Sequence, residues 1–100
     1  MQDGSNFNLI SKIANEDVDK LVKAQESYGD SWRSRGGVGA FMMLARKWDR
    51  IENQVTKDGY NIFDTIYNDP SNSGILDDIR DLRRYLLLVE GFMSNGENFD

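Results

Sequence analysis

The chain of 100 residues has no cysteine and no histidine. The absence of cysteine excludes a disulfide framework, a thiol nucleophile and a thiolate metal site. Without histidine, zinc catalysis and imidazole acid–base chemistry are excluded as well. Any chemistry that this protein performs must therefore come from carboxylates, lysine, arginine and tyrosine.

Long apolar runs and excess positive charge are also missing. No run approaches the ~18 residues of a membrane-spanning helix, and the N-terminus lacks the basic-then-apolar layout of a signal peptide. We therefore expect no membrane partner and a cytoplasmic location. The net charge is −5, from 12 basic and 17 acidic residues. Because nucleic-acid affinity comes mainly from neutralising phosphates, we expect no binding to duplex nucleic acid.

What the chain does contain is helical periodicity. Hydrophobic residues make up 39% of it, which argues against a wholly disordered chain. Apolar residues recur every three or four positions, there is no strand-like alternation, and the chain has a single proline. The expected helices cover 16–28, 38–55, 62–67 and 75–93. We predict one all-α domain over 1–100, a small bundle of three main helices plus short ones, with loose tails at 1–8 and 95–100.

Local signals set the expected helix ends and the expected core. Asn15 is a candidate N-cap for a helix beginning at Glu16, and Gly29 is a candidate stop. Asp58 and Gly59 predict a turn. The expected core residues of the two longest patterns are Phe41, Leu44, Ala45, Trp48, Ile51 and Val55, and Ile75, Ile79, Leu82, Leu86, Val89 and Met93. The last pattern is widened by Tyr85, Leu87, Leu88 and Phe92, so we expect a dimer or higher homo-oligomer.

The segment 28–39 combines glycines with two arginines and two aromatic residues. Arg33 and Arg35 are candidates to contact a phosphate, and Trp32 and Tyr28 are candidates to stack on a base. The alternative is a tight turn between helices with Trp32 in the core. The Walker pattern GxxxxGK[ST] is absent.

Two acid pairs have the spacing of one helix face. Asp49 precedes Glu52 by three residues, and Asp78 precedes Asp81 by three residues. If the two helices packed together, four carboxylates would meet, and a hard cation such as Mg²⁺ would explain that. The alternative is that all four acids lie on solvated helix surface.

The acid pairs resemble a known motif. Asp49-x-x-Glu52, 25 intervening residues, then Asp78-x-x-Asp81 is similar to the ExxE…ExxD pattern of the MazG-type all-α nucleoside-triphosphate pyrophosphohydrolases. The family prefers Glu where this chain has Asp49 and Asp78, whose side chains are one methylene shorter. The resemblance implies that Asp49, Glu52, Asp78 and Asp81 bind Mg²⁺ and that Glu52 or Asp78 takes a proton from the attacking water. It also implies phosphate contacts from Lys47 and Arg50.

A second resemblance covers residues 23–90. Lys23, the segment 28–32 (YGDSW) and the segment 47–51 (KWDRI) resemble small phage and bacterial proteins that are associated with nucleotide modification. This resemblance implies a nucleotide-directed protein that would work in the host cytoplasm if a phage encodes it. The alternative is a non-catalytic acidic protein that binds a nucleotide, or that inhibits a host defence protein by docking on its basic surface. A structural interaction module is a third interpretation.

Overall fold

The computed structural model describes residues 4–69 and 74–95, and every regular element within them is a helix. The elements are α1 (Gly4–Tyr28), the 3₁₀ helix η1 (Ser31–Arg33), α2 (Gly36–Thr56), α3 (Ile62–Asn68) and α4 (Gly74–Ser94). The predicted all-α class, with three long helices and short ones, is confirmed. None of the described helices is long and apolar enough to cross a membrane.

The chain divides into two compact units. The first ends at Ser34 and contains α1 and η1, and the second begins at Arg35 and contains α2, α3 and α4. The expectation of one domain over 1–100 stays a prediction. Of the expected tails, residues 4–8 belong to α1, whereas 1–3 and 96–100 lie outside the described residues.

Helix α1 is longer than expected. It runs through Asn15 without a break, so the predicted N-cap and the helix start at Glu16 are wrong. No proline or glycine interrupts the sequence between Gly4 and Gly29, and an internal asparagine costs a helix only a fraction of a kcal/mol. The predicted stop is confirmed, because Gly29 has a left-handed backbone (φ 59°) and donates its N–H to the carbonyl of Gln25 at 2.9 Å.

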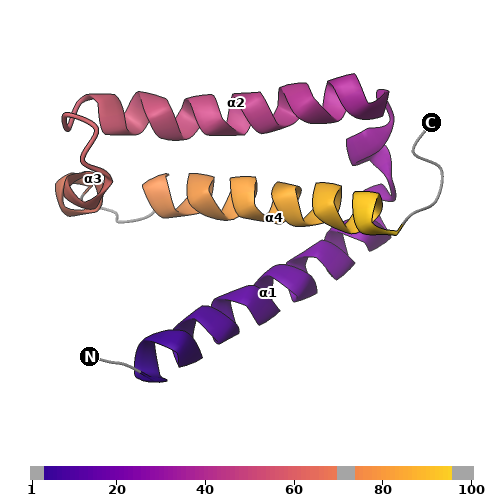
Figure 1. The fold of residues 1–100 in the computed structure, drawn as a ribbon, viewed down its shortest axis with the longest axis horizontal. Helices are drawn as coiled ribbons and strands as arrows, with labels where there is room; N and C mark the ends of the chain where they lie inside the picture. The colour runs from indigo at the N-terminus through magenta and orange to yellow at the C-terminus, as the bar shows by residue number, and fades with distance from the viewer. Residues whose placement is uncertain (1–3, 70–73, 96–100) are drawn as a thin grey trace. The chain divides into compact units, whose positions relative to one another are not determined.

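In the second unit, α2 and α4 lie side by side and antiparallel, with α3 at the end where α2 finishes and α4 starts (Figure 1). Their shared core is small. It consists of Ile51, Val55 and Ile75, and three partly buried residues pack against it: Ile66, Ile79 and Leu82. Apolar burial therefore stabilises the end of the helix pair that lies next to α3.

The connection from α2 to α3 agrees with the turn expected at Asp58 and Gly59. Gly59 has φ 65°, a left-handed conformation that glycine adopts without steric cost. Asn61 then caps α3, because its side-chain oxygen accepts hydrogen bonds from the backbone N–H groups of Phe63 and Asp64. Of the apolar residues of α3, Ile66 packs against the core, whereas Phe63 is exposed.

Part of the expected core lies on the surface. Phe41 is 65% exposed and Trp48 is 54% exposed, and on α4 both Leu86 and Met93 are exposed. The side of α2 that meets α4 carries Ala40 and Ile51, which are buried. Trp48 is only three residues before Ile51, so helical spacing alone does not separate the exposed apolar positions of α2 from the buried ones.

We expect Ile75→Ala to lower the free energy of unfolding by about 2–4 kcal/mol, because Ile75 is 1% exposed and its loss leaves a cavity in a small core. Leu76→Ala is the matched control, since the neighbouring side chain is exposed, and we expect it to cost less than about 1 kcal/mol. Urea denaturation followed by circular dichroism measures both. Equal losses for the two variants would contradict the position of the core.

Candidate functional site

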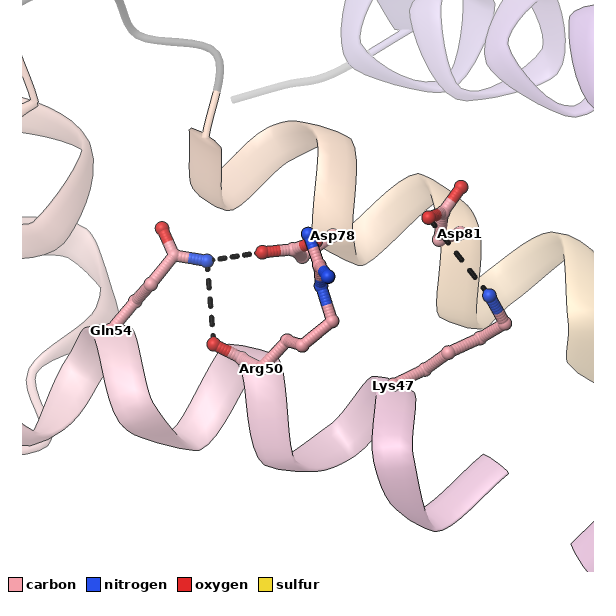
Figure 2. A network of polar contacts seen from close by, with 5 residues as sticks. All are labelled: Lys47, Arg50, Gln54, Asp78 and Asp81. Atoms are coloured by element: carbon pink, nitrogen blue, oxygen red, sulfur yellow. Dashed lines mark hydrogen bonds and ion pairs between the residues drawn. The ribbon is translucent and has the colours of Figure 1, made fainter. Parts of the chain in front are cut away.

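The polar side chains between α2 and α4 form one network (Figure 2). Arg50 donates from Nε to Oδ1 of Asp78 at 2.9 Å, and Gln54 donates from Nε2 to Oδ2 of the same carboxylate. One turn further along α4, Asp81 faces Lys47, with 3.9 Å between Oδ2 and Nζ. Asp78 and Asp81 therefore point toward α2, where their partners are two cations and an amide.

The network follows from spacing on two antiparallel helices. Lys47, Arg50 and Gln54 are three and four residues apart and share one edge of α2. Asp78 and Asp81 are three apart and share one edge of α4. Because the helices run in opposite directions, the later residues of the α2 edge meet Asp78, and the earlier Lys47 meets Asp81.

The two ion pairs differ in burial, and therefore in how much each contributes to stability. The Asp78 side chain is 9% exposed, so its charge needs partners, and both of its oxygens have one. The Arg50 side chain is 68% exposed and stays largely hydrated, which limits the Coulomb gain of the pair. The Lys47–Asp81 pair is long, and Asp81 is exposed, so we expect it to contribute little to stability.

Helix α4 begins close to the same network. Asp69 accepts a hydrogen bond from the backbone N–H of Gly74 at 3.0 Å, at the first residue of the helix. A Cβ atom at Gly74 would lie 3.2 Å from both Oδ2 of Asp69 and Oε1 of Gln54. Glycine at this position therefore lets Gln54 reach between the helix start and Asp78.

The four predicted metal ligands do not gather. Asp49 and Glu52 are exposed on α2, and neither belongs to the edge that faces Asp78. No three Asp or Glu within 4–69 and 74–95 are arranged to hold a metal ion. As they lie, the four carboxylates do not fit one Mg²⁺ ion, since Arg50 and Gln54 occupy the carboxylate of Asp78. The assignment of Glu52 and Asp78 as catalytic bases stays a prediction.

The predicted nucleotide-contacting residues fall in both units. Tyr28, Trp32 and Arg33 belong to the first, where Tyr28 is exposed and Trp32 is half-buried in η1. Arg33 forms an ion pair of 3.1 Å with Asp30, which also accepts a hydrogen bond from Gln25. Arg33 is therefore engaged in an exposed ion pair just after the end of α1.

Arg35, Lys47 and Arg50 belong to the second unit. Lys47 and Arg50 form the ion pairs with α4 described above. Arg35 directly precedes α2, and a Cβ atom at Gly39 would lie 2.7 Å from its Cβ. The glycine therefore gives the Arg35 side chain room over the first turn of α2, which is a structural reason for a glycine in this segment.

Sequence did not assign two residues to the site: Gln54, which belongs to the network, and Tyr85, which contacts Lys47. Gln54 lies four residues after Arg50, on the same edge, so helical spacing was a usable signal. Tyr85 was grouped with the apolar residues of α4, although Lys47 lies 5.6 Å from the centre of its ring. Burial raises the pKa of the Tyr85 phenol above its ordinary value of 10.0.

No family model matches this chain, and neither a curated protein nor a solved structure matches it. The resemblances to MazG-type enzymes and to proteins associated with nucleotide modification therefore rest on the motif residues alone.

We expect Asp78→Ala to lower the free energy of unfolding by about 1–3 kcal/mol, because Arg50 and Gln54 lose the group that links α2 to α4. Asp77→Ala is the matched control. It removes the adjacent carboxylate, whose 2.7 Å pair with Arg80 is exposed, and we expect a loss below about 0.5 kcal/mol. Urea denaturation measures both, and a larger loss for the Asp77 variant would contradict the role of Asp78.

Tyr85 makes the free energy of unfolding depend on pH in the alkaline range. Because the folded state raises the pKa of the phenol, the neutral phenol is favoured in the folded protein. This stabilisation is complete below pH 10.0 and is lost as the pH rises through the folded pKa. In Tyr85→Phe we expect the free energy of unfolding to fall less steeply above pH 10.0 than in the unmodified chain. Urea denaturation at a series of alkaline pH values tests this, and parallel falls would contradict it.

Proposed function

We propose that this protein is a non-catalytic, protein-binding helical module in which Asp78, one of the four motif acids, has a structural role. The observation that supports this most directly is the carboxylate of Asp78, which is buried between two helices and bound by Arg50 and Gln54. A metal-binding carboxylate must offer its oxygens to the ion. Here both oxygens are used to join α2 to α4.

The surface of the second unit supports binding to protein. Large apolar side chains are exposed on α2 and α4. Exposed apolar residues that gather on one face are typical of protein–protein contact surfaces. The net charge of −5 makes nucleotide phosphates and nucleic acid poor general partners.

The competing functions are the ones that the motifs imply. A Mg²⁺-dependent pyrophosphohydrolase would use Asp49, Glu52, Asp78 and Asp81 as ligands, with the metal polarising the triphosphate and activating water. A nucleotide-binding protein would bind phosphates through arginine or lysine side chains without turnover. Each of these functions predicts a different result when the chain is incubated with nucleoside triphosphates and Mg²⁺.

We expect no pyrophosphate release above a protein-free control when the chain is incubated with each nucleoside triphosphate and Mg²⁺. We also expect no shift in melting temperature with the same ligands, since a ligand that binds only the folded state raises that temperature. Stabilisation without turnover would replace our proposal with a nucleotide-binding function. Turnover would establish an enzyme.

Any turnover must be traced to the chain itself. Glu52→Gln is the variant for this purpose, because Glu52 is exposed and the change leaves the Asp78 network intact. Turnover that is lost in Glu52→Gln at unchanged melting temperature would overturn the non-catalytic assignment. Turnover that persists unchanged in this variant would show only that Glu52 is not required for it.

A further inference from the structure

The outward side of α3 carries two aromatic rings and a carboxylate. Phe63 is 75% exposed, Tyr67 is 83% exposed, and Asp64 is exposed as well. Tyr67 follows Phe63 by four residues and Asp64 by three, so the three side chains share one face of the helix. Thr65, which is buried, and Ile66, which packs against the core, lie on the other side. We call Phe63, Asp64 and Tyr67 the α3 face.

The second unit already contains a similar combination of groups, with a cation held by them. Lys47 lies 5.6 Å from the centre of the Tyr85 ring, and its Nζ is 3.9 Å from Oδ2 of Asp81. Asp81 and Tyr85 are four residues apart, so they are neighbours on the surface of α4. The ring attracts the cation through its quadrupole, and the carboxylate adds an ion pair. The α3 face has a carboxylate and a ring at nearly the same spacing, together with a second ring.

Asp64 is the carboxylate of this region that has no partner inside the unit. The segment 58–69 contains three acids and neither lysine nor arginine. Asp58 and Asp69 each accept a hydrogen bond within the unit, at 2.7 Å and 3.0 Å. Within residues 4–69 and 74–95, no lysine or arginine pairs with Asp64. The charge on the α3 face is therefore negative, and its complement is a cation.

The turn that leads into α3 displays a third aromatic residue at a conformational cost. Tyr60 is exposed and has φ 66°, a left-handed backbone that is uncommon for a bulky residue. Its N–H donates to the carbonyl of Val55, a bond that any residue except proline could form. A tyrosine at this position therefore costs stability, and contact with a partner would offset that cost.

We propose that the α3 face binds a cationic segment of another protein, rich in arginine or lysine. This inference rests on the proposed protein-binding function and names the chemistry of the partner. A cationic side chain of the partner lies over the rings of the α3 face and pairs with its carboxylate, as Lys47 does on α4. The net charge of −5 attracts the same class of partner over a longer range.

Nuclear magnetic resonance of the isotopically labelled full chain, titrated with a hexa-arginine peptide, tests this proposal. We expect saturable amide shifts that centre on residues 60–67. Phe63→Ala should weaken binding about fivefold, because one ring is lost, and Asp64→Asn about threefold, because the ion pair is lost. Both side chains are exposed, so we expect both variants to fold.

Two matched controls lie in the same unit, away from α3. Phe41→Ala removes an exposed phenylalanine near the start of α2, and Glu90→Gln removes an exposed charge near the end of α4. These ends of α2 and α4 lie opposite α3 (Figure 1), so both variants should bind hexa-arginine as the unmodified chain does. Equal weakening by Asp64→Asn and Glu90→Gln would indicate attraction by net charge alone and would overturn the proposal. A Phe63→Ala variant that binds like Phe41→Ala, or a titration without shifts, would overturn it as well.

The two proposals can fail separately. A chain that does not bind hexa-arginine, releases no pyrophosphate and binds no nucleotide would refute the α3 site and leave the non-catalytic, protein-binding function standing. A chain that binds the peptide at the α3 face and hydrolyses nucleoside triphosphates would retain the site and refute the function.

Discussion

The buried carboxylate of Asp78 is the constraint on which the second unit depends. A charge that is 9% exposed between two helices is tolerable only when both oxygens have partners, and Arg50 and Gln54 supply them from α2. The requirement fixes the register of α4 against α2, because only one antiparallel alignment brings the three residues together. In this structure both oxygens of Asp78 are engaged by side chains of α2.

The small apolar core is the second interaction that holds α2 against α4. Ile51, Val55 and Ile75 are buried near the end where α3 packs. The rest of α2 has apolar residues that its two neighbours in the unit leave exposed. Burial of those residues against another chain would add to stability in proportion to the apolar area removed from water. A binding role is therefore consistent with the way in which the unit is stabilised.

Particular residues show how far sequence could predict the fold and the site. Gly29 was predicted to end a helix and Gly59 to lie in a turn, because glycine adopts a left-handed backbone without steric cost. Both residues have that conformation. Asn15 was misread, because a cap-forming side chain is also tolerated inside a helix. Phe41 and Trp48 were assigned to the core, because helical spacing predicts an apolar stripe without saying which part of it a neighbouring helix will cover.

The sequence by itself determined that the chain is helical and where Gly29 and Gly59 end or turn it, because periodicity and glycine act over a few residues; the start of α1 was not determined in this way. It also determined that Asp78 and Asp81 share a face with each other, and that Lys47 and Arg50 share another. Only the tertiary structure decided that these two faces meet, so that Asp78 opposes Arg50 and Gln54 while Asp49 and Glu52 stay exposed. Local spacing fixes which residues share an edge of a helix, but the packing of two helices fixes which edges touch.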